Sequence, residues 1–142
     1  MIYINGAVKF IQLLQKYNIN INALQLSLTY IIKCIYPNYN KSTTIKFVCR
    51  KCKINYGMYE FTKKRIVICN AVDSKDLLLQ TIIHEFKHWM QHNIDHIPPN
   101  MITDNSVDYD HNKYEQQCVA FEKLYKQVGQ LLEIYENIRT IF

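Results

Sequence analysis

Apolar residues recur with two different periods along the 142-residue chain, and each change of period marks a predicted element. Residues 8–17 and 22–35 place apolar side chains three and four positions apart, which predicts two helices. Pro37 ends the second one. From Thr44 to Arg50 the apolar residues alternate with polar ones, which predicts a strand.

Two more strands are predicted in the middle of the chain. They are Gly57–Phe61 and Ile66–Cys69, and the polar residues 62–65 between them predict an antiparallel hairpin. Helical spacing then returns beyond the capping residues 73–76 and lasts until Pro98-Pro99 ends that helix. Its predicted buried positions are Leu77, Leu78, Ile82, Phe86 and Trp89.

A polar loop over residues 100–112 precedes the last predicted helix, which begins at Lys113. The buried stripe of this helix comprises Tyr114, Cys118, Phe121, Tyr125, Val128, Leu132 and Tyr135. The order helix, helix, about three strands, helix, loop, helix predicts one α+β domain spanning residues 1–142. In that domain a small antiparallel or mixed sheet packs on the helices.

The third predicted helix contains the pattern His84-Glu85-x-x-His88. A helix places residues four apart on the same face, roughly 6 Å apart along its axis. Two imidazoles so arranged can bind one Zn²⁺, and Glu85 then lies where it can take a proton from a water activated by the metal. The pattern predicts a zinc-dependent hydrolase with Glu85 as general base.

A catalytic zinc site needs a third protein ligand besides His84 and His88. His92 lies about 12 Å along the helix axis from His84, which is too far for the same ion. His96 stays open as a ligand if the chain turns back after the helix. The favoured candidate is Glu115, an acid in the first turn of the last helix, at the edge of the buried stripe.

Glu122, two turns further along the same helix face, is the second candidate ligand. Asp108 and His111 in the preceding loop also remain open. The oxyanion that forms during hydrolysis needs a hydrogen-bond donor besides zinc, and Tyr109, His111 and Tyr114 are the candidates.

The order Gly57-x-Tyr59, a strand over residues 66–68, the motif, and then Tyr114-Glu115 resembles the small zincin-like metallopeptidases of phages and bacteria, including the ImmA/IrrE-type proteases. The resemblance implies a zincin-like fold, a bound zinc and Glu115 as its third ligand. It also implies that a peptide substrate pairs with the strand 66–69 or with its hairpin partner. The chain departs from the family's Glu-x-Glu-Ala pattern, whose last two places hold Gln117 and Cys118.

The composition indicates the cellular compartment in which the protein works. Five cysteines without a framework spacing indicate reduced thiols and hence an intracellular protein. Cys49-x-x-Cys52 has zinc-knuckle spacing but lacks a second pair, so we interpret it as two thiols at a strand end. No run of residues is long and apolar enough to predict a membrane span, and the N-terminal residues do not resemble a signal peptide.

The net charge of +5 is compatible with an acidic partner or with nucleic acid, although the basic residues are scattered in the sequence, with short clusters at 50–53 and 63–65. The preferred hypothesis is a zinc endopeptidase that acts on a protein or peptide. Two alternatives are a non-catalytic binding protein stabilised by zinc, and a nucleic-acid-associated protease that cleaves bound proteins.

Overall fold

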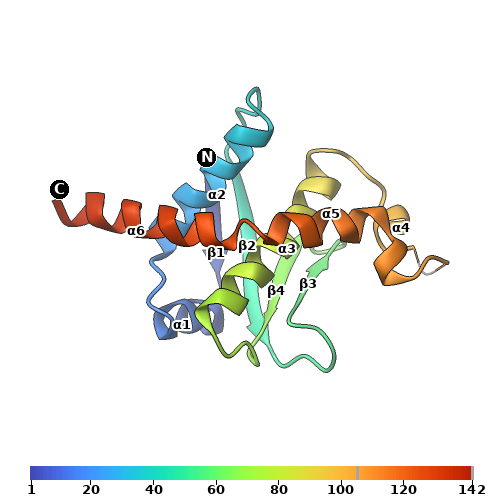
Figure 1. Cartoon of the computed structure of the whole chain (residues 1–142), viewed down its shortest axis with the longest axis horizontal. Helices are drawn as coiled ribbons and strands as arrows, with labels where there is room; N and C mark the ends of the chain where they lie inside the picture. The colour runs from blue at the N-terminus through green and yellow to red at the C-terminus, as the bar shows by residue number, and fades with distance from the viewer. Residues whose placement is uncertain (105, 142) are drawn as a thin grey trace.

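A computed structural model describes residues 1–104 and 106–141, with the side chains of 139–141 left aside (Figure 1). Its elements, in chain order, are β1 (Ile2–Gly6), α1 (Val8–Lys16), α2 (Ile21–Ile35), β2 (Thr43–Arg50), β3 (Gly57–Glu60), β4 (Arg65–Cys69), α3 (Lys75–Asn93), α4 (Pro99–Ile102), a 3-10 turn (Tyr109–His111), α5 (Lys113–Glu122) and α6 (Tyr125–Ile141). The described part of the chain is therefore α+β, as predicted.

The sheet has the strand order β1-β2-β4-β3. The pairs β1–β2 and β2–β4 are parallel, and the predicted hairpin β3–β4 is antiparallel, which confirms a mixed sheet. The prediction of about three strands was one too low, because β1 was not recognised. Ile2 and Ile4 of β1 face the core, and Ile2 pairs with Thr43 far along the chain.

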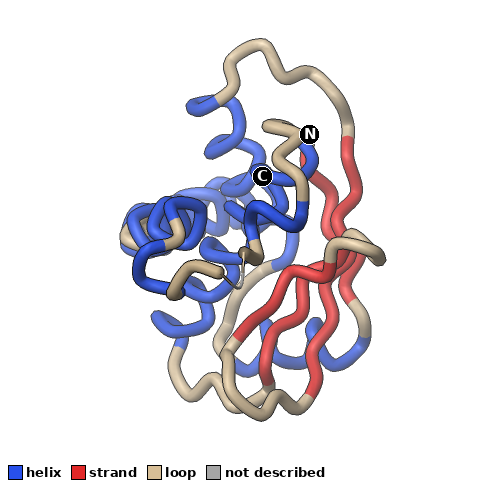
Figure 2. The backbone as a smooth tube through the Cα atoms, turned by 90° about the vertical axis from the view of Figure 1, so that its right-hand side faces the viewer, coloured by secondary structure: helices blue, strands red, loops and turns tan. Residues whose placement is uncertain are grey.

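The helices pack mainly on one side of this sheet, as Figure 2 shows. Phe10 of α1 lies on Phe47 of β2, with ring centroids 4.9 Å apart. Helix α2 covers the outer edge of β1, where the side chains of Thr29 and Gln25 accept hydrogen bonds from the backbone N–H groups of Ile2 and Ile4. One edge of the sheet is thus closed by a helix, and the other edge is β3.

Helix α3 lies against β3 and β4 and carries the motif. Ser74 caps its N-terminus, because its hydroxyl accepts a hydrogen bond from the N–H of Leu77 at 3.1 Å. The helix ends at Asn93, several residues before the two prolines that were expected to end it. Pro98 and Pro99 instead open the short helix α4, where a proline costs no intrahelical hydrogen bond.

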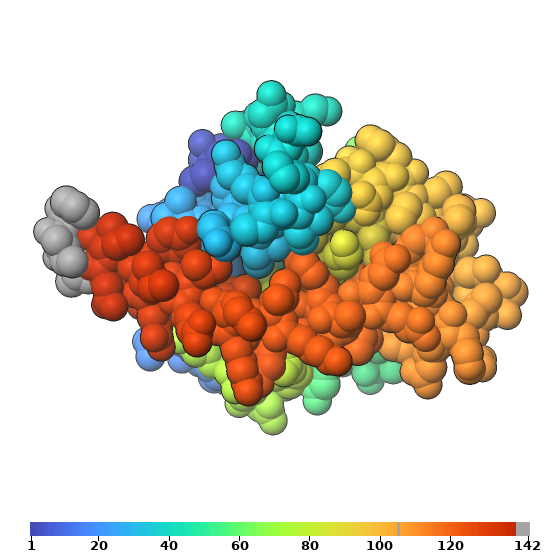
Figure 3. Space-filling model, turned by 45° about the horizontal axis from the view of Figure 1, so that its top comes forward, coloured from blue at the N-terminus to red at the C-terminus, as the bar shows by residue number. Residues whose placement is uncertain are grey.

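The last predicted helix is two helices, which corrects the expectation of one continuous element. α5 ends at Glu122 and α6 begins at Tyr125, and the predicted buried stripe continues across the break. Both helices pack on α3, and α6 also packs on α2. Figure 3 shows α5 and α6 as one band across the molecule that leaves only a small part of α3 visible.

Candidate metal centre

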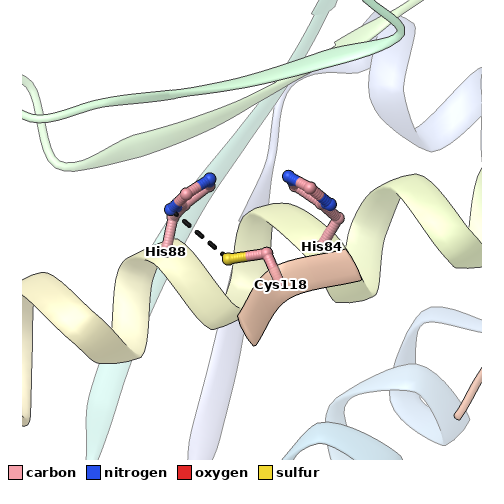
Figure 4. A group of neighbouring side chains, drawn as sticks. All are labelled: His84, His88 and Cys118. Carbon is pink, nitrogen blue, oxygen red and sulfur yellow. Dashed lines mark hydrogen bonds between the residues drawn. The ribbon is translucent and has the colours of Figure 1, made fainter. Parts of the chain in front are cut away.

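The two histidines of the motif project from the same side of α3 (Figure 4). The centroids of the His84 and His88 rings are 5.1 Å apart, and the two side chains are 12% and 7% exposed. Helical spacing therefore brings the two imidazoles together in a largely buried position, as the motif predicts.

Glu115 reaches both imidazoles from α5. Asn112 fixes the first turn of this helix, because its side chain accepts hydrogen bonds from the N–H groups of Tyr114 and Glu115. Oε1 of Glu115 lies 2.9 Å from Nε2 of His88, and Oε2 lies 3.1 Å from Nε2 of His84. One carboxylate thus bridges the facing nitrogens of both rings.

Glu122, the second candidate ligand, lies at the other nitrogen of His84. Its Oε2 atom is 3.0 Å from Nδ1 of His84, whereas Glu115 contacts Nε2 of the same ring. Two acids that are two helical turns apart therefore contact opposite sides of one imidazole. A carboxylate at Nδ1 fixes the tautomer and raises the basicity of Nε2, which is the usual support for a metal-binding histidine.

The outer nitrogen of His88 has a similar partner in Gln91. Oε1 of Gln91 lies 3.0 Å from Nδ1 of His88. The amide nitrogen of Gln91 donates to the backbone oxygen of Tyr114 and to Oε1 of Gln117. These two acceptors fix the orientation of the amide, so Nδ1 of His88 must be the donor to Gln91. Its Nε2 atom is the nitrogen that faces Glu115.

Four ring nitrogens therefore face four oxygens. A neutral imidazole has only one N–H, so two neutral rings cannot donate to all four of these oxygens. Such a cluster of acceptors in a buried place requires either extra protons or a cation. Imidazole nitrogen and carboxylate oxygen are ordinary zinc ligands, and the residues present fit a divalent metal of that kind.

The pKa values of the metal-free site reflect the same contacts. Burial alone would lower the pKa of His84, but its contacts with Glu115, Glu85 and Glu122 raise it to about 9. Burial alone would raise the pKa of Glu115, but hydrogen bonds with His84 and His88 hold it at about 2. Protons therefore occupy the positions where a metal would bind, and metal binding would release them.

Cys118, one turn after Glu115, also lies close to the histidines. Its sulfur is 3.4 Å from Nδ1 of His88 (Figure 4), and ligand atoms of His84, His88 and Cys118 all lie within 4.8 Å of one another. The sequence pattern predicts Cys118 only as a member of the buried stripe. Its position three residues after Glu115, on the same helix face, is the signal that could have identified it.

Between the two candidates for a third ligand, the geometry favours Glu115. The carboxylate faces both Nε2 atoms, whereas Cys118 approaches His88 at the nitrogen that already donates to Gln91. Burial and the neighbouring carboxylates of Glu115 and Glu85 raise the pKa of Cys118, so its thiol is neutral in the metal-free protein. A thiol must lose its proton before it can bind a metal.

Glu85 lies beside the two histidines and is 6% exposed. Burial raises its pKa to about 7, although the nearby His88 and His84 and a hydrogen bond from the backbone of Tyr59 act in the opposite direction. A carboxyl group that titrates near neutral pH can both accept and return a proton. This property agrees with the role of general base that the motif predicts.

Gly57 allows β3 to approach α3 next to Glu85. A Cβ atom on Gly57 would lie 2.6 Å from Cγ2 of Thr81 and 3.0 Å from Cγ of Glu85. Thr81 cannot easily turn away, because its hydroxyl donates to the backbone oxygen of Leu77 at 2.7 Å. The strand and the helix therefore pack at a distance that only glycine permits.

We expect Gly57→Ala to destabilise the protein by about 1–3 kcal/mol, because the added methyl group forces β3 away from α3. Gly129→Ala is the matched control. Gly129 lies inside α6, and its added Cβ would meet Leu79 at an ordinary 3.9 Å, so alanine should stabilise by about 0.5–1 kcal/mol. Denaturant unfolding of both variants measures the difference, and equal effects would contradict the close packing at Gly57.

A cleft of about 480 Å³ opens onto this group of residues. One wall is β3 with the preceding loop, another is α3, and a third comprises α5 with the segment before it. The residues that border the cleft include Asn55, Tyr56, Gly57, Met58, Tyr59, Gln80, Thr81, His84, Glu85, His88, Thr103, Tyr109, Glu115, Val119 and Glu122. The two histidines, Glu85 and Glu115 are thus accessible from one side.

Of the three candidate oxyanion donors, Tyr109 borders the cleft. Its hydroxyl interacts with Glu115, and burial together with that carboxylate raises the pKa of Tyr109, so it keeps its proton at neutral pH. His111 is exposed and lies 3.7 Å from Asp108, which is also exposed. Tyr114 is buried in the stripe of α5. Tyr109 is therefore the candidate donor that lies at the cleft.

The other histidines lie away from the centre. Nδ1 of His92 is 3.0 Å from the hydroxyl of Tyr59, and its ring packs on Phe61, so it supports the contact between α3 and β3. His96 is exposed and adopts a positive φ of 55°.

The Cys49-x-x-Cys52 pair also lies outside the metal-ligand group found among the described residues. Cys49 is buried at the end of β2, and the sulfur of Cys52 lies 3.6 Å from the backbone oxygen of Arg50. This arrangement agrees with the interpretation of two thiols at a strand end.

No helix in the described residues combines the length and the apolar character needed to cross a membrane. A scan of protein-family models, a search of curated proteins and a search of solved structures each gave no significant match to this chain.

Proposed function

We propose that this chain is a zinc-dependent peptidase with a zincin-like fold. The observation that carries the proposal is the carboxylate of Glu115, which contacts Nε2 of both motif histidines while each Nδ1 has its own acceptor. His84, His88 and Glu115 would hold the metal. The metal, when bound, supplies a Lewis acid that activates water and polarises a carbonyl oxygen.

Glu85 is the proton carrier of the proposed reaction. It borders the cleft next to His84 and His88, and its pKa of about 7 allows it to take a proton from the attacking water. The same carboxyl group then returns the proton to the leaving amine. Tyr109, whose hydroxyl interacts with Glu115 in the metal-free protein, would give up that contact and donate its hydrogen bond to the oxygen of the scissile carbonyl.

The edge strand β3 is the element that would hold an extended peptide. The N–H of Cys69 donates to the backbone oxygen of Tyr56 at 2.7 Å. Tyr56 and Cys69 are therefore a hydrogen-bonded pair at the end of the β3–β4 hairpin. Antiparallel pairs alternate, so the backbone groups of Gly57 and Tyr59 point outward from the sheet. The backbone N–H of Tyr59 donates to the carboxyl group of Glu85. The outward backbone groups of Gly57 would then pair with a substrate.

Two strands were predicted as possible pairing partners of a peptide, residues 66–69 and their hairpin partner. Strand β4 is internal to the sheet, so the pairing strand is its hairpin partner β3. The opposite edge, β1, has Thr29 and Gln25 of α2 on its outward N–H groups. Backbone pairing at β3 would place the peptide across the cleft, beside Glu85.

A second candidate function rests on Cys118. If Cys118 joined His84, His88 and Glu115, the metal would have four protein ligands and no position for water, which is the pattern of a structural zinc site. The protein would then be a non-catalytic binding protein stabilised by zinc.

Cys118→Ser distinguishes the two functions. We expect this variant to keep one zinc per chain and to hydrolyse a quenched-fluorescence peptide library at a rate within a few-fold of the wild type, because Glu115 is the third ligand. Chelation should stop hydrolysis and added zinc should restore it. Loss of zinc and of folding in Cys118→Ser, with no hydrolysis by the wild type, would favour the structural site instead.

A further inference from the structure

The positive charge of the chain is concentrated in one segment. Between residues 41 and 69 lie eight of the 17 Lys and Arg residues but only one of the 12 Asp and Glu residues, Glu60. This segment therefore carries a net charge of +7, and the remaining nine basic and eleven acidic residues give −2. The excess charge of the whole protein thus belongs to a single segment.

This segment forms β2, β3, β4 and their connections, so the fold gathers its charges on one sheet. Along β2 the side chains of Ile45, Phe47 and Cys49 face the core, whereas Lys46 and Arg50 are exposed on the other face. The parallel register places Lys46 beside Arg65. Basic side chains thus line the face of the sheet that points away from the main helical layer.

The loops at both ends of these strands extend the charge. Lys51 and Lys53 follow β2, and Lys63 and Lys64 lie in the hairpin turn between β3 and β4, all four exposed. We call this surface the basic face; its members are Lys46, Arg50, Lys51, Lys53, Lys63 and Arg65. Lys64 is not a member, because its charge lies near His92 of α3 and lowers the pKa of that imidazole. The two loop clusters that appeared scattered in the sequence lie at opposite ends of β4, roughly 15 Å apart.

The single acid of the segment is already paired. Oε1 of Glu60 lies 2.6 Å from Nε of Arg65 and 3.7 Å from a guanidinium nitrogen of Arg50. The cluster orders the two arginines and neutralises one of their two charges. The remaining positive charge is directed at solvent along the strands and loops.

An exposed aromatic side chain shares this face with the cations. Tyr3 of β1 is 46% exposed and lies in register with Thr44, next to the row that contains Lys46. A strand surface that combines cations with an accessible aromatic ring suits unpaired bases, which can stack on the ring while their phosphates contact lysine and arginine.

We propose that the basic face binds single-stranded nucleic acid through its phosphates, with Tyr3 as a stacking surface. A regular polyanion matches six basic side chains on neighbouring strands and their loops better than an acidic peptide does, because a peptide would also need recesses for its side chains. The cleft, which offers such recesses, opens beside α3 on the helical side of β3. Binding at the basic face requires neither the metal nor Glu85. This proposal is therefore independent of the proposed peptidase function.

The test is fluorescence anisotropy of a labelled 20-nucleotide oligo-dT, measured with the full chain over a series of salt concentrations. The first variant is Lys46→Gln/Lys51→Gln/Lys63→Gln. The matched control is Lys33→Gln/Lys123→Gln/Lys126→Gln, which removes three exposed lysines from the helical layer. Each triple substitution lowers the net charge by three, so the two differ only in where the charge is lost.

We expect the basic-face variant to bind about tenfold more weakly or worse, and its plot of log K against log salt to be less steep by about 2, since each contact with a single-strand phosphate contributes about 0.7. The control should stay within about twofold of the wild type. Tyr3→Ala should weaken binding about fivefold or more, and Tyr3→Leu, which stays bulky but lacks the aromatic ring, should weaken it similarly.

Three results would overturn the proposal. The first is an absence of wild-type binding at about 50 mM salt, where phosphate contacts are strong. The second is an equal loss in both triple variants, which would mean that only net charge matters. The third is displacement of the oligonucleotide by polyglutamate or by a DNA duplex at lower charge concentration than by unlabelled oligo-dT, which would assign the face to acidic protein segments or to double-stranded DNA.

Discussion

Replacing Glu85 by glutamine should reduce peptide hydrolysis by about 10²–10⁴-fold while the metal stays bound. Glutamine has nearly the same shape as glutamate, so it can keep the contact with the backbone of Tyr59, but it cannot accept a proton from water. The measurement pairs zinc analysis of the purified variant with turnover of any peptide that the wild type cleaves.

Glu85→Asp is the informative companion variant. It keeps a carboxyl group but withdraws it by one methylene, so it should retain zinc and recover part of the activity that glutamine loses. If Glu85→Gln turned over at the wild-type rate, Glu85 would not be the base. If it lost its zinc, Glu85 would be part of the metal site and not of the proton transfer.

The second large effect is expected at Glu115. Glu115→Ala should weaken zinc binding by more than about 100-fold and remove hydrolysis, because it deletes the one carboxylate that faces both Nε2 atoms. Competition with a chelator of known zinc affinity measures the first effect, and the peptide assay measures the second. Zinc binding and peptide hydrolysis should be lost together in this variant.

Glu122→Ala is the matched control, since it removes the other carboxylate of the same helix face. Glu122 contacts the outer nitrogen of His84, so its loss should weaken zinc binding by about 10–100-fold, the range typical of partners that orient a metal ligand. A larger loss in Glu122→Ala than in Glu115→Ala would exchange the roles of the two acids.

Local features of the site could be predicted from the sequence because they depend on neighbouring residues. Helix periodicity fixes the positions of His84 and His88 on one face, and Ser74 marks where that helix begins. Glu115 could be proposed because an acid next to a buried stripe needs a partner, and the structure brings it to both histidines.

Contacts between distant segments could not be predicted in this way. The sequence pattern has no signal for the carboxylate of Glu122 at the far side of the His84 ring, because that contact depends on how α5 lies across α3. The amide of Gln91 lies one turn after His88 on the same helix, but its orientation is fixed by acceptors on α5. The strand β1 is short, and its pairing with β2 joins segments about forty residues apart. The break between α5 and α6 contains neither glycine nor proline, and the apolar stripe gives no sign of it.

The distribution of positive charge on the surface also depends on the pairing of distant strands. In the sequence the clusters at 50–53 and 63–65 look like two ordinary solvated strand ends. Only the parallel pairing of β2 with β4 brings Lys46, Arg50 and Arg65 onto a single face, with the two loop clusters at its ends.

The central claim is that His84, His88 and Glu115 bind one zinc ion, and X-ray absorption spectroscopy of the zinc-loaded protein tests it most directly. Zinc bound by two imidazoles and a carboxylate has only nitrogen and oxygen neighbours, at about 2.0–2.2 Å. We expect that shell with no sulfur, in the wild type and unchanged in Cys118→Ser. A sulfur neighbour at about 2.3 Å that disappears in Cys118→Ser would contradict the claim, because Cys118 would then be a ligand of the metal.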